Sequence, residues 1–172
     1  MKNILIVVDM QNGFDRYEQT HILAKKVIEL TNSGIFDKII ATRFLNKEGS
    51  QYTKFINWHR LMSSPDIDLV EGIKADAVVD KWVYTCVTKD FLELLKKCND
   101  GELPSHIFVC GVDTDCCVMK TATDLFEQSI MPIVGFKSFL GLYSAALRSA
   151  TTLFSICISF LPIFGIKKTA LA

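Results

Sequence analysis

Short apolar runs, separated by amphipathic stretches, are the feature that most constrains the fold of this chain. In NILIVV (3–8) the apolar residues are continuous rather than alternating, which is typical of a strand buried on both faces. Runs of a similar kind predict further strands at residues 37–43, 76–81, 106–112 and 130–136. The stretches between them predict helices at 21–34, 88–98 and 116–129, and a loop region with short helices at 44–75.

This alternation of strands and helices predicts an α/β fold. Successive strands joined by helices form right-handed crossovers, which give a mostly parallel sheet with helices on both faces, a three-layer Rossmann-like domain. At 172 residues, the chain is expected to form a single domain over residues 1–172.

The composition indicates which classes of partner are not expected and which cellular compartment is. The 19 basic side chains balance the 19 acidic ones, so there is no electrostatic reason to expect binding to nucleic acid or to an anionic membrane. Asp9 and Gln11 interrupt the apolar start MKNILIVVDMQ, and we interpret it as a strand rather than a signal peptide. The six cysteines form no regular framework and no CxxC pair, which indicates reduced thiols in the cytoplasm and no structural zinc site.

Chemically active side chains follow three of the predicted strands at the point where each strand ends. Asp9 comes directly after the first strand, and Lys81 closes the third. The turn at 113–117, which contains Cys116 and Cys117, follows the fourth. Because ligands bind at the carboxyl ends of the strands in parallel α/β sheets, we expect an acid, an amine and a thiol at one rim.

These three groups have the chemistry of acyl transfer. A thiol at a helix start lies near unpaired backbone N–H groups, and with a nearby ammonium these predict a thiol pKa lowered from about 8.5 toward 7 or below. The Asp9 carboxylate is a candidate base, and the N–H groups of the turn are candidate donors to an oxyanion. The residues alone leave a structural alternative open, in which Asp9 caps a turn, Lys81 is solvated and the cysteines pack in the core.

Three motifs in order along the chain, IVVDMQNGF, VVDK and VCGVDTDCCVMKTATD, resemble the isochorismatase-like cysteine hydrolases. That family includes nicotinamidases and other small-amide hydrolases, and the resemblance covers about residues 1–134. It implies that Asp9 is the general acid/base, that Lys81 orients Asp9 and stabilises the thiolate, and that Cys117 is the nucleophile.

The same resemblance implies an unusual backbone before Cys117. In this family a cis peptide bond precedes the residue that matches Asp113, so a cis Val112–Asp113 bond is expected. The backbone N–H groups of Asp113 and Cys117 would then form the oxyanion hole, and Cys116 would occupy a variable position of the motif.

The resemblance also bears on metal binding. Nicotinamidases of this family hold a metal through an Asp-x-His motif after the second strand and a second histidine downstream. Here the region reads TRFLNKEGSQYTKFINWHRL, which has no Asp-x-His, and His59 is its only histidine. We therefore expect no catalytic metal and no cofactor, and this argues against nicotinamide as the substrate.

Aromatic and basic side chains near the same rim are candidates for a substrate pocket. The aromatic residues are Phe14, Phe44, Trp58, Trp82 and Tyr84, and ordinary core packing is the alternative for each. Arg43 follows the second strand, where it either meets an anionic group of the substrate or forms a surface salt bridge.

Residues 135–172 depart from the family pattern. They include TTLFSICISFLPIFGI (151–166), 16 residues without a charge, which are short for a membrane span and broken by Pro162, so we expect no membrane helix. A buried helix, an oligomer contact and a sequence altered by a frameshift all remain open. Because exposed apolar surface here would be a liability, a homo-oligomer is expected.

The expected function is hydrolysis of a C–N bond in a small amide, through an acyl-enzyme on Cys117. One alternative is vinyl-ether hydrolysis of the isochorismatase type, in which Asp9 acts as an acid without a thiol nucleophile. Another is a non-catalytic relative that binds a small molecule or a partner chain.

Overall fold

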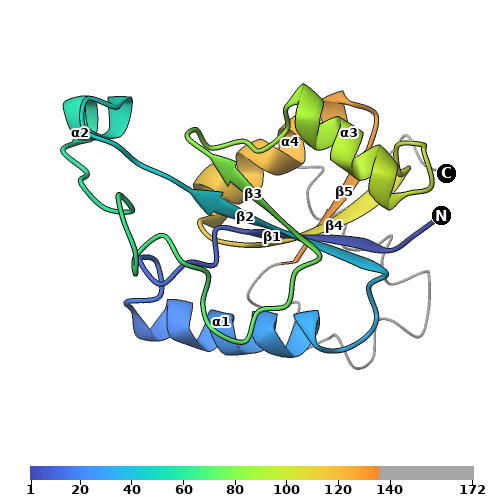
Figure 1. Cartoon of the computed structure of the whole chain (residues 1–172), viewed down its shortest axis with the longest axis horizontal. Coiled ribbons are helices and arrows are strands. Elements are labelled where there is room, and N and C mark those ends of the chain that lie inside the picture. Colours follow the sequence, from blue (N-terminus) through green and yellow to red (C-terminus); the bar gives the residue numbers. More distant parts are fainter. Residues whose placement is uncertain (136–172) are drawn as a thin grey trace, which may run out of the picture. The chain divides into compact units, whose positions relative to one another are not determined.

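The computed structural model of the chain describes residues 1–135, and these contain one parallel sheet. Its five strands have the order β3-β2-β1-β4-β5 (Figure 1). The strands are β1 (Ile4–Val8), β2 (Lys38–Phe44), β3 (Ala77–Lys81), β4 (His106–Gly111) and β5 (Met131–Val134). Every neighbouring pair is parallel, which confirms the predicted α/β class. The central strand β1 is buried along its whole length, as its continuous apolar sequence predicts.

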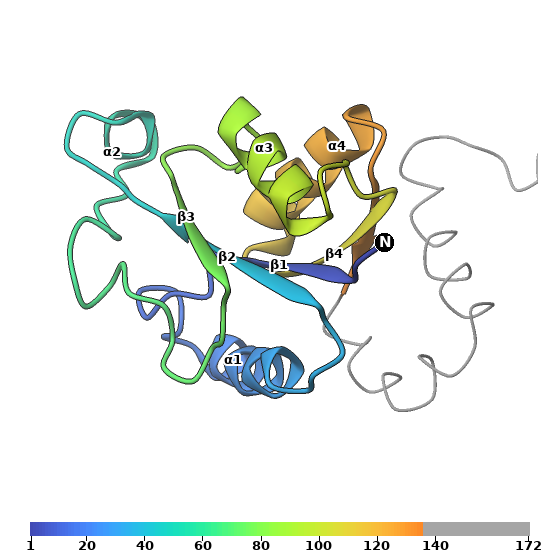
Figure 2. The ribbon, with the colours of Figure 1, turned by 45° about the vertical axis from the view of Figure 1, so that its right-hand side comes forward.

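Helices cover both faces of this sheet. Their bounds are α1 (Glu18–Thr31), α2 (Gln51–Ile56), α3 (Lys89–Cys98) and α4 (Met119–Glu127). Helix α1 lies on one face, and α3 and α4 lie on the other, whereas α2 stands apart from the sheet (Figures 1 and 2). Helix α3 begins at the predicted cap, because the Thr88 hydroxyl accepts a hydrogen bond from the Phe91 N–H at 3.2 Å.

The helix that carries the two adjacent cysteines differs from its prediction. The sequence pattern predicts a helix from residue 116, but the chain first forms a π-helical segment, η1 (Thr114–Val118), and becomes α-helical only at Met119. In η1 the Val118 N–H donates to the Asp113 carbonyl at 3.1 Å, which is a wider turn than an α-helix makes. Cys117 therefore lies inside an irregular turn rather than on the face of a regular helix.

The register of the strands brings the predicted site residues to one edge of the sheet. Val8 pairs with Gly111, so Asp9 and the turn at 113–117 leave the sheet at the same level. Gly111 has φ +127°, and a Cβ at this position would come within 2.0 Å of the Val8 carbonyl oxygen, so only glycine fits. On the other side, Phe44 pairs with Lys81, which places the lysine at the same edge.

Residues 1–134 form one compact unit. None of the helices within residues 1–135 has the length and apolar character that crossing a membrane requires. The expectations for the C-terminal part of the predicted domain fall on residues outside the described range.

Candidate active site

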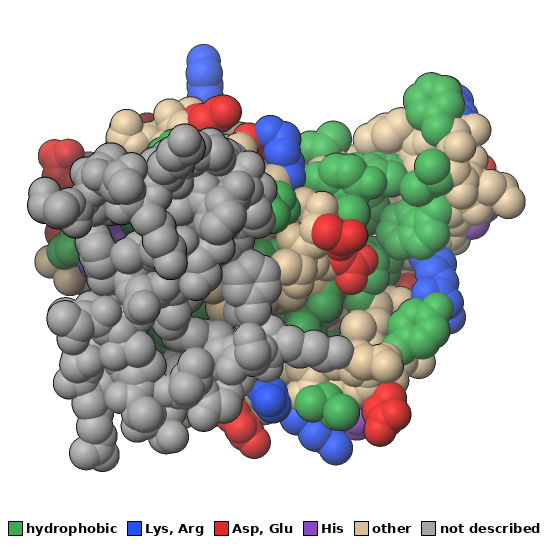
Figure 3. All heavy atoms as spheres, turned by 180° about the vertical axis from the view of Figure 1, so that it is seen from behind, with side chains coloured by type: hydrophobic (Ala, Val, Ile, Leu, Met, Phe, Trp, Pro, Cys, Tyr) green, Lys and Arg blue, Asp and Glu red, His purple; other side chains and the backbone are tan. Residues whose placement is uncertain are grey.

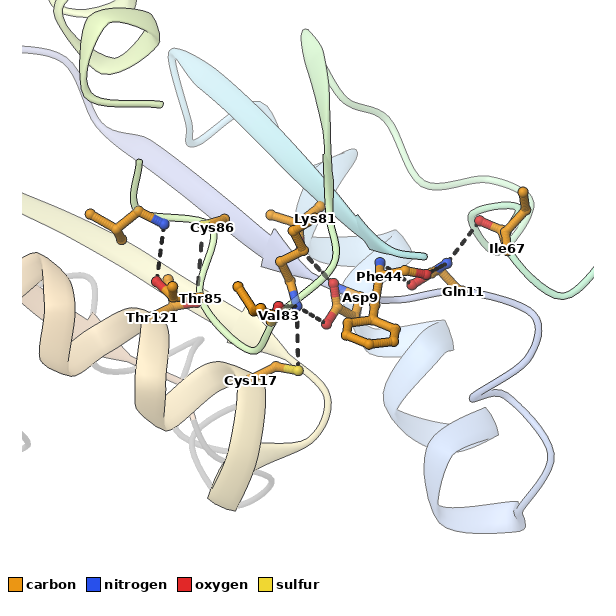
Figure 4. Close-up of polar contacts among 12 residues, drawn as sticks. Asp9, Gln11, Phe44, Ile67, Lys81, Val83, Thr85, Cys86, Cys117 and Thr121 are labelled. Atoms are coloured by element: carbon orange, nitrogen blue, oxygen red, sulfur yellow. Dashed lines mark hydrogen bonds and ion pairs between the residues drawn. The ribbon is translucent and has the colours of Figure 1, made fainter. Parts of the chain in front are cut away.

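Lys81 joins the two other side chains that the sequence places at this rim. Its ammonium Nζ lies 2.7 Å from Asp9 Oδ2 and 3.4 Å from Cys117 Sγ (Figure 4). All three side chains are buried, with at most 4% of each residue exposed. The structural alternative in which Lys81 is solvated is therefore wrong, because the amine is enclosed between an acid and a thiol.

Two further contacts fix the ammonium of Lys81. Nζ donates a hydrogen bond to the Val83 carbonyl at 3.2 Å, and it lies 5.1 Å from the centroid of the Phe44 ring. The negative face of an aromatic ring attracts a cation at this distance. Lys81 is therefore held by a carboxylate, a thiol, a carbonyl and a ring, which leaves its charge little freedom to move.

Asp9 is oriented by Thr42, a residue that the sequence pattern did not single out. The Thr42 hydroxyl donates to Asp9 Oδ1 at 2.6 Å, and the Asp9 N–H donates to the Thr42 carbonyl at 3.2 Å. Both residues are fully buried. Asp9 has φ +52°, a left-handed backbone conformation that residues other than glycine adopt sparingly. With Oδ1 held by the hydroxyl, Oδ2 faces Lys81. A hydroxyl residue that follows the apolar residues 39–41 and directly precedes Arg43 near the end of the strand is the signal that would have identified Thr42.

Gln11 is a second buried polar residue that the sequence analysis left without a role. Its side-chain amide donates to the carbonyls of Phe44 and Ile67 at 3.0 and 2.9 Å, and its Oε1 accepts from the Phe44 N–H at 2.7 Å (Figure 4). The amide thus ties the end of β2 to the loop before β3 and holds Phe44 in place. Gln11 acts on the site indirectly, because the Phe44 ring lies against the Lys81 ammonium.

The pKa of the Cys117 thiol moves in the opposite direction from the sequence-based prediction. Burial raises this pKa above its ordinary value, the neighbouring charge of Asp9 raises it further, and the charge of Lys81 offsets only part of the effect. The prediction considered the helix start and the ammonium, but it lacked the burial of the thiol and the nearness of the carboxylate. A raised pKa favours the protonated form of this thiol, so an attack by its sulfur would need a base.

The backbone before Cys117 has the cis peptide bond that the resemblance implied, between Val112 and Asp113. Among residues 1–135, the Asp113 N–H donates no hydrogen bond to another backbone group or side chain. Burial, followed by the charges of Asp115 and Asp9, raises the pKa of the Asp113 carboxyl group. Within the described residues, the Asp113 N–H is thus an unused backbone donor in the turn that contains Cys117.

The candidate pocket residues have different environments. Phe44 is buried in a cluster with Tyr52 and Leu61, against which Phe14 and Trp58 pack. Tyr84 lies against Tyr52, with the ring centroids 5.5 Å apart.

Among the six candidate pocket residues, Tyr84 alone lines the pocket described below; Phe14, Phe44 and Trp58 lie outside its wall, as do Trp82 and Arg43. Trp82 is 54% exposed and does not line the pocket described below. Arg43 makes two contacts with the Asp80 carboxylate, at 2.7 and 3.0 Å, so the salt-bridge alternative holds for it within the described structure.

The donors that a metal centre needs are not assembled in the described part of the chain. Within residues 1–135 there is no group of three or more His, Cys, Asp or Glu side chains placed to hold a metal ion. Both ring nitrogens of His59 are engaged, with Glu48 at 2.8 Å and Asn57 at 2.9 Å. These residues do not fit a metal centre of the nicotinamidase type, and no step proposed below uses one.

Comparison with solved structures shows the same fold in several hydrolases. N-carbamoylsarcosine amidase from Thermoplasma acidophilum has a TM-score of 0.64 and 20% identity, over 84% of this chain and 91% of that one. Nicotinamidase from Bacillus subtilis has a TM-score of 0.65 and 13% identity, over 97% of this chain and 98% of that one. Pyrazinamidase of Pyrococcus horikoshii, solved in complex with zinc, has a TM-score of 0.56 and 21% identity, over 91% and 96%.

Sequence comparison identifies the family more directly. A search of curated proteins gives no match. Residues 3–135 match the family model of the isochorismatase domain, a range that contains Asp9, Lys81 and Cys117. The chain therefore belongs to the isochorismatase domain family.

Proposed function

We propose that this protein is a cysteine hydrolase that cleaves a C–N bond of a small amide through an acyl-enzyme on Cys117. The observation that carries the proposal is the Lys81 ammonium, which contacts the Asp9 carboxylate and the Cys117 sulfur at the same time. Family membership and the likeness to an amidase and a nicotinamidase agree with this chemistry.

Acylation begins with a proton transfer. As the Cys117 sulfur attacks the carbonyl carbon, the S–H proton passes to the Asp9 carboxylate, and the carbonyl π electrons move to the oxygen. The resulting oxyanion accepts hydrogen bonds from the backbone N–H groups of Asp113 and Cys117. The C–N bond then breaks, Asp9 gives its proton to the leaving nitrogen, and a thioester remains on Cys117.

Deacylation repeats these steps with water. Asp9, again a carboxylate, accepts a proton from the water that attacks the thioester carbonyl. When the C–S bond breaks, the proton returns from Asp9 to sulfur and the carboxylic acid product leaves. The Lys81 ammonium contacts both groups, and its charge stabilises the Asp9 carboxylate and the sulfur as negative charge develops there.

The raised pKa of the Cys117 thiol supports a direct role of Asp9 in acylation. Because burial and the Asp9 charge disfavour a resting thiolate, the sulfur must lose its proton during the attack. The Asp9 carboxylate, which contacts the same ammonium as the sulfur, is our candidate for the base that accepts this proton. A hydrolase built in this way is protected from side reactions of a free thiolate until a substrate is present.

The test is ammonia release from a panel of small amides, measured with the wild type and with Cys117→Ser. We expect the substitution to lower kcat by about 1000-fold or more, because an alcohol is a much weaker nucleophile in this setting. Cys116→Ser is the matched control, and it should retain activity because the neighbouring thiol contacts neither Lys81 nor Asp9 within the described structure. Retained amidase activity in Cys117→Ser would exclude the mechanism.

Cys117→Ser also distinguishes amide hydrolysis from the isochorismatase-type alternative. Hydrolysis of a vinyl ether needs only the acid Asp9, so it should survive Cys117→Ser. Arg43, the cation considered for an anionic group of the substrate, is paired with Asp80. This pairing favours an uncharged substrate such as an amide.

A further inference from the structure

A pocket of about 450 Å³ lies between α2 and the segment that follows β3. It is lined by Gln51, Tyr52, Phe55, Ile56, Val83, Tyr84, Thr85 and Lys120. Phe55 and Ile56 are 82% and 64% exposed, and Val83 and Tyr84 are exposed as well. Figure 3 shows hydrophobic side chains gathered on the face of the molecule that carries α2. Single exposed apolar residues are ordinary, but several around one hollow indicate a ligand site.

This pocket adjoins the candidate active site through shared contacts. The backbone carbonyl of Val83, which lines the pocket, accepts the hydrogen bond from Lys81 Nζ. Tyr52, which also lines the pocket, packs edge-on against Phe44 with ring centroids 4.9 Å apart, and the Phe44 ring in turn lies 5.1 Å from the Lys81 ammonium. A molecule in the pocket would therefore touch residues that contact Lys81 or Phe44.

The pocket wall offers no free charge. Lys120 is the one charged residue among the eight that line it, and its ammonium is paired with Asp124 one helical turn away. The remaining lining side chains are apolar, aromatic or neutral polar. Among the described lining residues, Lys120 is the one side chain whose charge could compensate a carboxylate, and it is already paired with Asp124, so burying a neutral group here costs less than burying a charged one.

We propose that this pocket binds the apolar group of an uncharged amide, an aryl or branched alkyl group, next to the carbonyl that Cys117 attacks. The inference rests on the function proposed above and adds the substrate class. A second copy of this chain is the alternative occupant, but the contact of the lining residue Val83 with Lys81 favours a substrate group, since a protein partner needs no approach to the catalytic amine.

The test compares the binding of two amides that differ by a phenyl ring, propionamide and 3-phenylpropionamide. Binding is measured by NMR titration of the full chain carrying Cys117→Ser, so that the amide is not consumed. We expect the phenyl compound to bind about tenfold more tightly, because its ring leaves water for an apolar wall. The backbone signals of Ile56, Tyr84 and Thr85 should shift.

Pocket variants locate the effect. Phe55→Ser with Ile56→Ser should remove most of the tenfold preference, and both side chains are exposed enough for the fold to tolerate the change. Phe126→Ser is the matched control, since Phe126 is 60% exposed but does not line the pocket, and it should keep the full preference.

Two outcomes would overturn the inference. Equal affinity for the two amides excludes an apolar subsite, and a preference that survives the pocket variants places the subsite elsewhere. Sedimentation of the same variants tests whether a second copy of the chain occupies the pocket. If the wild type and Phe126→Ser are dimers and only Phe55→Ser with Ile56→Ser dissociates, the pocket belongs to an interface between copies. The proposed function fails separately, if the wild type releases ammonia from neither amide while the binding preference stands.

Discussion

The ammonium of Lys81 and the carboxylate of Asp9 form an ion pair at 2.7 Å that is almost completely excluded from water. A buried pair gains little net stability over an apolar pair, but removal of one partner leaves an uncompensated charge. The ion pair therefore affects both the chemistry of the site and the stability of the folded chain.

Lys81→Met is expected to lower the free energy of unfolding by about 3–5 kcal/mol, because the Asp9 carboxylate loses its partner. The double variant Asp9→Asn with Lys81→Met leaves no buried charge and should recover a large part of this loss. Urea unfolding of the wild type, Lys81→Met, Asp9→Asn and the double variant measures the effect. Additive losses in the double variant would show that the two side chains do not depend on each other.

Thr42→Val should reduce kcat with little change in KM, because it removes the hydroxyl that donates to Asp9 Oδ1 at 2.6 Å. A hydrogen bond to a charged group contributes about 1.5–3 kcal/mol, so a fall of roughly 10- to 100-fold is expected. Thr42→Ser keeps the hydroxyl and should restore most of the activity. If Thr42 had only a structural role, kcat would follow the stability of each variant, and Thr42→Ser would not restore kcat beyond what its stability explains.

The alkylation of Cys117 by chloroacetamide should accelerate with pH. Because burial and Asp9 raise the pKa of this thiol, the reactive thiolate fraction should grow about tenfold per pH unit between about pH 7 and 9. The measurement is made in the Cys116→Ser background by peptide mass spectrometry, so that the neighbouring thiol does not react. A rate independent of pH over this range would mean that a thiolate already exists at neutral pH.

Stability should fall in alkaline solution because of buried thiols. Burial raises the pKa of Cys110 from 9.0 to about 12, so between these values the unfolded chain has lost a proton that the folded chain retains. The free energy of unfolding then falls as pH rises, by about 1.4 kcal/mol per pH unit for each such thiol. Cys110→Ala should make the slope shallower by this amount, as measured by urea unfolding, and an unchanged slope would contradict the assignment.

Removal of metal ions should leave hydrolysis unchanged. Within residues 1–135 no three donor side chains are placed to hold an ion, and the proposed steps use only Asp9, Lys81 and Cys117. Dialysis against EDTA followed by an assay of ammonia release tests this. Loss of activity that zinc restores would show a metal site elsewhere in the chain.

Much of the fold could be predicted because its signals are local. The sequence identifies two elements within one residue of their observed bounds: β1 from the apolar run at 3–8, and α3 from the amphipathic stretch at 88–98. A continuous apolar run indicates a strand buried on both faces, and helical periodicity indicates which face of a helix is buried. The position of Asp9, Lys81 and the 113–117 turn at one edge followed from the rule that parallel strands present their carboxyl ends together. The choice of Cys117 over Cys116 came from the motif and not from periodicity.

Tertiary structure decided what depends on distance and on the exclusion of water. The sequence alone predicted a lowered pKa for Cys117, and the structure reverses the direction because the thiol is buried beside Asp9. The contact between Thr42 and Asp9 joins residues 33 positions apart, so no local pattern contains it. Arg43 was open to two roles until its pairing with Asp80 on the neighbouring strand was seen. The apolar pocket likewise exists only because α2 is brought opposite the segment after β3, which local propensities cannot determine.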